Sequence, residues 1–103
     1  MSTPRSTISE RDFQHQVVTL ARLYNWRVYS IPDSRRSTET GFPDLMLWNA
    51  NRSRSFLAEL KTEKGRLSAD QVLVIDELRS CGHQVYVWRP SDWPEIEALL
   101  TTR

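Results

Sequence analysis

Apolar residues recur at helical spacing in the first quarter of the chain. The repeat is preceded by Ser9, a good N-cap residue, with Asp12 three residues later in a capping-box pattern. Its apolar members are Phe13, Val17, Leu20, Ala21 and Tyr24. This spacing predicts a helix that begins near Ser9 and ends at Asn25, after a disordered polar tail at residues 1–8.

Short apolar runs predict four strands. Residues 26–31 and 84–88 are rich in β-branched and aromatic side chains, which favour extended backbone. Residues 44–48 and 55–61 are joined by the polar stretch 49–53, as in an antiparallel hairpin. The tryptophans on these runs are expected to pack in the core; they are Trp26, Trp48 and Trp88.

Two further helices are predicted. Ser68 and Gln71 form a second capping-box pair, and Gly82 ends the helix that they begin. This helix carries a broad apolar face made of Val72, Leu73, Val74, Ile75 and Leu78. A short last helix at residues 92–101 follows Pro90. Its buried side chains are expected to be Ile96, Leu99 and Leu100.

The order of these elements is helix, three strands, helix, strand, helix. The helix at 68–82 joins the third and fourth strands, and it is long enough for a right-handed parallel crossover. We therefore expect an α/β fold in which residues 9–103 form a single domain. Its core is a mixed four-stranded sheet flanked by helices.

Composition narrows the classes of protein without naming one. A chain of 103 residues with 39% apolar and 26% charged residues is ordinary for one globular domain. The single cysteine, Cys81, excludes an internal disulfide and is expected at a core position, and two histidines do not support a zinc site. With no long apolar run and no signal peptide, we expect no membrane contact and a cytoplasmic location.

The third predicted strand contains the residues with the clearest chemistry. Because side chains alternate along a strand, Phe56, Ala58 and Leu60 share one face. Glu59 and Lys61 then project together from the other face. The formal net charge is only +1, so local clusters such as this one must carry any argument for a nucleic-acid partner.

Asp44 begins the neighbouring strand, so the hairpin is expected to bring it beside Glu59. Two carboxylates about 4 Å apart repel by about 4 kcal/mol at an effective dielectric of 20. A divalent cation relieves that repulsion, and hard oxygen ligands, including the Leu60 carbonyl, favour Mg²⁺ or Mn²⁺. Lys61 would orient a water molecule or stabilise charge on a phosphate. The simpler alternative is a same-face ion pair, because Glu-x-Lys alone is common.

The wider pattern resembles a known family. GFPDL at 41–45, LAELKTEKGRLSADQ at 57–71 and GHQVYVW at 82–88 together resemble the virus-type replication-repair nuclease (VRR-NUC) domain. This family is a branch of the PD-(D/E)XK nucleases, and the resemblance runs from Glu10 to Trp93. It implies a restriction-endonuclease-like αβββαβ core in which a metal binds Asp44, Glu59 and the Leu60 carbonyl. It also implies that Lys61 is catalytic.

The resemblance adds two residues to the candidate site. Glu10 matches an acidic residue in the family's first helix, where it would join the metal ligands, although the helix dipole alone also favours an acid there. Gln71 matches the family's glutamine, although capping of its own helix also explains it. Gln14 faces the same way as Glu10.

Stand-alone members of the family are similar to Holliday-junction resolvases and tend to be homodimers from phage and bacterial genomes. The resemblance therefore implies an endonuclease that cuts branched, Holliday-junction or flap DNA during replication or repair. Two alternatives stay open: a module that binds structured DNA without cutting it, and a nuclease for duplex DNA or RNA.

Basic residues flank the candidate site on two loops. The arginines and lysine expected to contact the DNA backbone are Arg35, Arg36, Lys64 and Arg66. Arg52 and Arg54 lie in the hairpin turn and are expected to be ordinary solvated surface.

Overall fold

The computed structural model describes residues 7–32 and 38–102. In these residues the helices are α1 (Glu10–Leu23), α2 (Ala69–Ser80) and α3 (Trp93–Thr101), with short 3-10 turns η3 (Ala50–Arg52) and η4 (Pro90–Asp92). The strands are β1 (Arg27–Ser30), β2 (Leu45–Asn49), β3 (Arg54–Leu60) and β4 (Val85–Trp88). Every predicted helix and strand is therefore present, with ends that differ by one or two residues.

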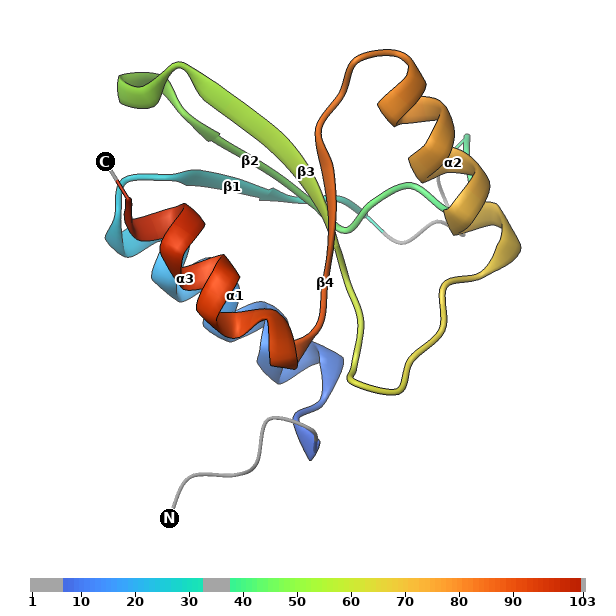
Figure 1. Cartoon of the computed structure of the whole chain (residues 1–103), viewed down its shortest axis with the longest axis horizontal. Coiled ribbons are helices and arrows are strands. Elements are labelled where there is room, and N and C mark those ends of the chain that lie inside the picture. The colour runs from blue at the N-terminus through green and yellow to red at the C-terminus, as the bar shows by residue number, and fades with distance from the viewer. Residues whose placement is uncertain (1–6, 33–37, 103) are drawn as a thin grey trace.

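The strands form one sheet in the order β1-β2-β3-β4. β1, β2 and β3 pair antiparallel, and β4 pairs parallel to β3 after the α2 crossover. Figure 1 shows α1 and α3 side by side on one face of the sheet and α2 on the other. This is the predicted mixed sheet flanked by helices.

The alternation expected along β3 divides the core into two parts. Phe56, Ala58 and Leu60 pack with α1 and α3 in the larger cluster. Leu57, on the opposite face, packs with Ile75 of α2 in a much smaller one. Glu59 shares the face of Leu57, so its carboxyl lies on the thinly covered side of the sheet.

The broad apolar face predicted for α2 is wrong in its extent. Within α2 only Ile75 is buried, while Val72 is 45% and Leu73 is 57% exposed. Cys81 is exposed as well, because it lies past the last turn of α2 rather than under it. Trp48 is also 36% exposed, since its face of β2 lies beyond the reach of α2. A single stripe of α2 contacts the sheet, and that stripe is narrower than the apolar pattern suggested.

Arg52 has a structural role rather than a solvated one. Its guanidinium donates to the carbonyls of Leu99 and Leu100 at 3.1 and 3.2 Å and lies over the Trp26 ring. It therefore satisfies carbonyl groups at the end of α3, which a helix cannot pair internally. Arg54 likewise donates to the Tyr86 hydroxyl at 3.0 Å. The prediction that both arginines are ordinary solvated surface is therefore wrong, since both are half-buried and hydrogen-bonded.

Gly41 brings the start of the Asp44 strand against α2. Its φ is +85°, a conformation that residues with a Cβ rarely adopt. A Cβ at Gly41 would lie 2.6 Å from the backbone carbonyl of Asp70 and 2.8 Å from the nitrogen of Gln71. The chain can pass this close to the first turn of α2 only because position 41 has no side chain.

None of the helices in the described residues is long and apolar enough to cross a lipid bilayer.

The close approach at Gly41 is testable by comparison with Gly82. Both glycines have positive φ, but a Cβ at Gly82 would meet nothing within 4 Å. We expect Gly41→Ala to lower the free energy of unfolding by about 1–3 kcal/mol more than Gly82→Ala, because it adds overpacking to the backbone strain. Urea denaturation measures both. Equal losses would show that the contact with α2 is not close in solution.

Candidate active site

Asp44 lies where β2 begins, and its position is set by the hairpin. The pairing of Leu45 with Ala58 places Asp44 next to the end of β3. One carboxylate oxygen of Asp44 accepts the backbone N–H of Leu60 at 2.8 Å. The Asp44 carbonyl also accepts the N–H of Ile31 at 2.8 Å. The carboxylate is therefore held from β3, and the Asp44 backbone is held from the end of β1.

Glu59 is the buried centre of the site, with a side chain only 1% exposed. Its Oε2 accepts a hydrogen bond from Nε2 of Gln71 at 2.9 Å and lies 3.6 Å from Nζ of Lys61. Its Oε1 is buried and has no hydrogen-bond partner among the described residues. Buried polar atoms are rarely left unpaired, so this oxygen marks a place where a further group is expected.

The electrostatics of the two acids are coupled. Burial is the main cause that raises the pKa of Glu59 to about 8, with the charges of Asp44 and Glu10 adding to it and Lys61 opposing it. Burial also raises the pKa of Asp44, while the Leu60 N–H and Lys61 lower it. Without a cation, the pair therefore keeps a proton at neutral pH, because two adjacent buried charges are unfavourable.

Glu10 lies at the rim of this cluster. It is exposed, yet neighbouring atoms desolvate its carboxyl enough to raise its pKa, and the charge of Asp44 raises it further while Lys61 lowers it. No three His, Cys, Asp or Glu side chains in residues 7–32 and 38–102 stand close enough to form a complete metal site. Glu10 is thus within electrostatic reach of the pair, and its role as a ligand stays a prediction.

Gln71 has both roles that the sequence left open. Its Oε1 accepts the N–H of Ser68 at 2.9 Å, and its own N–H donates to the Ser68 hydroxyl at 3.1 Å, which completes the capping box. Its Nε2 is then directed to Glu59. The amide is the side chain that suits both tasks, because one end accepts and the other donates.

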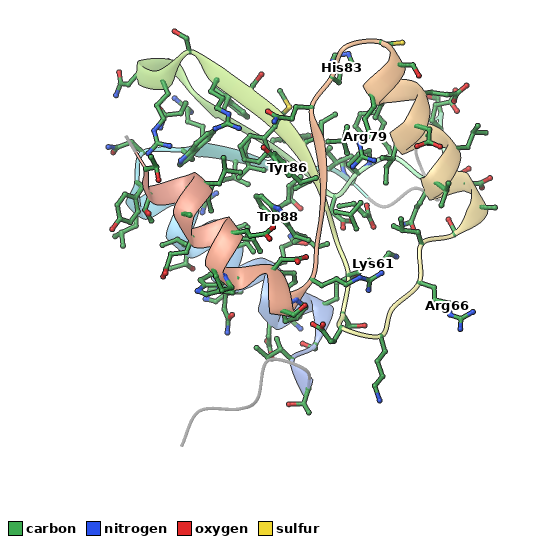
Figure 2. All side chains as sticks on the ribbon, viewed as in Figure 1. Lys61, Arg66, Arg79, His83, Tyr86 and Trp88 are labelled. Atoms are coloured by element: carbon green, nitrogen blue, oxygen red, sulfur yellow. The ribbon has the colours of Figure 1, made fainter. Side chains whose placement is uncertain are left out.

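Two of the predicted DNA-contacting residues, Lys64 and Arg66, are not part of this cluster. Lys64 and Arg66 are exposed on the loop between β3 and α2. Figure 2 shows Lys61 at the end of β3 and Arg66 farther along the loop, pointing away from the sheet. Arg35 and Arg36 lie outside the described residues.

Arg89 is a residue that the sequence analysis missed. It directly follows β4, and its Nη1 donates to the carbonyls of Thr62 and Gly65 at 2.7 and 2.5 Å, with Glu63 at 3.4 Å. Lys61 itself donates its N–H to the carbonyl of Trp88, at 3.0 Å. The β3–α2 loop is therefore held by the end of β4. An arginine before a proline carries no pattern in sequence that indicates this role.

A model of the VRR-NUC domain matches residues 7–92. The chain belongs to the VRR-NUC domain family. A solved VRR-NUC domain structure aligns with a TM-score of 0.71 at 20% identity, over 90% of this chain and 95% of that one. Hjc of Archaeoglobus fulgidus, a Holliday junction resolvase, aligns with a TM-score of 0.56 at 22% identity, over 76% of this chain and 64% of that one. At these identities the likeness shows the fold, which is the expected restriction-endonuclease-like one.

A curated relative matches a shorter stretch. Fanconi-associated nuclease 1 of Ailuropoda melanoleuca is 40% identical over 52 residues, which are 50% of this chain and 5% of that protein. The chain thus spans a small part of this relative's length. Membership of this family makes the chain a nuclease domain.

The side chains fit a hard divalent cation. Asp44 and Glu59 supply carboxylate oxygens, and a cation would displace the proton that the pair otherwise shares. Lys61 offsets part of the negative charge of Glu59. Such a donor set, oxygen alone with no sulfur or imidazole, favours Mg²⁺ or Mn²⁺ over zinc.

The raised pKa of Glu59 predicts how stability depends on pH. Its pKa is about 8 in the fold against 4.5 ordinarily, so the folded state binds the proton more tightly than the unfolded state. Without divalent cations, the free energy of unfolding should fall as pH rises from about 5 to 8. Mg²⁺ added at pH 8 should restore several degrees of melting temperature.

Thermal unfolding of Glu59→Gln and Glu95→Gln provides the comparison. The first should lose both the pH dependence and the response to Mg²⁺, while the second, an exposed acid on α3, should retain both. A Mg²⁺ response that survives in Glu59→Gln would exclude Glu59 as a ligand.

Proposed function

We propose that this VRR-NUC domain is a PD-(D/E)XK endodeoxyribonuclease that requires Mg²⁺ or Mn²⁺ and hydrolyses phosphodiester bonds in branched DNA. The observation that carries the proposal is the buried Glu59 carboxyl, with one unpaired oxygen, next to Asp44 and Lys61. Burying two neighbouring carboxylates costs free energy and does not stabilise the fold. A bound cation would remove that cost.

Asp44, Glu59 and the Leu60 carbonyl would hold the cation, with Glu10 at the rim. When bound, the ion supplies Lewis-acid polarisation of the phosphate and lowers the pKa of water. Gln71 orients the Glu59 carboxylate by donating to Oε2. Lys61, 16% exposed, faces the open side, where its ammonium group orients the attacking water or stabilises charge that develops on the phosphate.

Branched DNA is favoured as the substrate by the named relatives. One structural neighbour is a Holliday junction resolvase, and the curated relative is a Fanconi-associated nuclease. The described residues contain no second domain that would read a base sequence. A role in the replication or repair of phage or bacterial DNA, in the cytoplasm, stays a prediction.

A homodimer forms part of the proposal. A four-way junction has two-fold symmetry, and paired cuts need two centres. The outer surface of α2 supports an interface there, because Leu73 is exposed and a shallow apolar pocket lies on its side of the helix. That pocket is lined by Phe42, Val74, Leu78 and Cys81 together with Glu39 and Glu77.

Cleavage of a labelled four-way DNA junction tests the proposed chemistry. The wild type should cut it with Mg²⁺ or Mn²⁺ and not with EDTA. Lys61→Ala should lower kcat by about 10²–10³-fold, the cost of losing one charged group that stabilises a transition state. Asp44→Ala should abolish metal-dependent cutting.

Lys64→Ala is the matched control, because Lys64 is a lysine on the same loop that lies outside the cluster. It should raise KM and leave kcat unchanged. Equal cleavage by the wild type and Lys61→Ala would refute the assignment. Junction binding without turnover in any divalent metal would favour the non-catalytic module, and preference for duplex or RNA substrates would overturn the branched-DNA class.

Sedimentation equilibrium tests the dimer. Leu73→Glu places a charge in the proposed α2 interface and should convert dimers to monomers. Leu23→Glu is the control, since Leu23 is 74% exposed but lies at the end of α1. A wild-type monomer at micromolar concentration, or equal effects of both changes, would contradict an interface on α2.

A further inference from the structure

A groove of about 490 Å³ runs between α1 and the edge strand β1. Its lining includes Arg11, His15 and Arg22 from α1. These residues, together with Val18, fall at positions i, i+4, i+7 and i+11, which form one stripe on a helix. The stripe is distinct from the buried one of Phe13, Val17 and Ala21, so packing of the core does not explain it.

The groove shares one residue with the candidate active site. Glu10, at the rim of the acidic pair, also lines the groove at its near end. Beside it, Nε2 of Gln14 donates to the Ser30 hydroxyl at 3.2 Å and joins α1 to β1. Val18 of α1 and Val28 of β1 form the apolar part of the lining, and the basic side chains all come from α1. A chain that leaves the active site past Glu10 would therefore enter this groove.

The polar side chains of the stripe are available to a ligand. No ion pair or side-chain hydrogen bond between described residues involves Arg11, His15 or Arg22. Two arginines that line one groove and have no acidic partner indicate an anionic ligand. Eleven residues of helix separate Arg11 from Arg22, a rise of about 16 Å, so the two side chains can contact different phosphates of one DNA strand.

We propose that this groove binds the sugar–phosphate backbone of the DNA strand on one side of the scissile phosphate, with Arg11 and Arg22 as its phosphate contacts. The inference rests on the proposed function, because it concerns the substrate of the same site. It assigns the strand a path along α1, away from the β3–α2 loop that carries Lys64 and Arg66. It also gives α1 a second role beside its packing in the core.

Equilibrium binding of a fluorescent four-way DNA junction in EDTA tests the groove without cleavage. Arg11→Gln and Arg22→Gln together should weaken binding on the order of tenfold. The slope of log affinity against log salt should become shallower by about 0.7–0.9 for each contact removed. In Mg²⁺, KM should rise while kcat at saturating DNA stays unchanged, because neither side chain contacts the reacting atoms.

Arg27→Gln is the matched control. Arg27 is exposed on β1, but Val28 and Ser30 line the groove, so Arg27 points to the other face of the sheet. It removes one positive charge, as each of the two groove substitutions does, and should change neither affinity nor salt slope. A junction whose arm is shortened on the groove side of the cut should bind the wild type and the double variant with equal affinity.

The outcomes separate the two proposals. If the wild type cuts DNA but the double variant binds like Arg27→Gln, the groove proposal is overturned and the nuclease proposal stands. If the double variant weakens binding to DNA that the wild type never cuts, the groove is supported and the nuclease proposal fails. A wild type that binds no DNA overturns both, and unchanged melting temperatures exclude unfolding as the cause of any loss.

Discussion

The carboxyl groups of Asp44 and Glu59 lie next to each other at the end of the β2–β3 hairpin, and the surrounding structure holds them there. Desolvation and mutual repulsion oppose the charged form of Glu59, while Gln71, Lys61 and the Leu60 N–H next to Asp44 offset part of the cost. The buried Oε1 of Glu59 has no hydrogen-bond partner among the described residues. A protein keeps such an unpaired group where function requires it, and a divalent cation is the partner whose charge and ligand preference match.

Several elements serve this one arrangement. The hairpin sets Asp44 beside Glu59, and Gly41 allows the chain to pass against the first turn of α2. That turn presents Gln71, whose amide caps the helix and reaches Glu59 at once. Arg89 holds the loop that follows Lys61. Helix capping, tight backbone packing and orientation of the carboxyl are thus coupled, so damage to one affects the others.

The local charge of each surface, rather than the net charge of the chain, determines which ligands it attracts. The net charge of the chain is +1, yet basic side chains gather in the groove along α1 and on the β3–α2 loop, on either side of an acidic centre. The proposed cation would bind at the centre, and the basic side chains around it suit a polyanion. This pattern is what an enzyme for phosphodiesters requires, because ligand and metal must be attracted to adjacent places.

The sequence alone determined the elements, their order, the mixed sheet and the face of β3 that carries Glu59 and Lys61, since these follow from local periodicity and turn chemistry. Only the tertiary structure decided how much of α2 is buried, why Arg52 is not ordinary surface, and that Arg89 holds a distant loop. It also decided the pKa of Glu59 and the groove along α1. Burial and long-range contacts set these features, and no spacing within one segment encodes them.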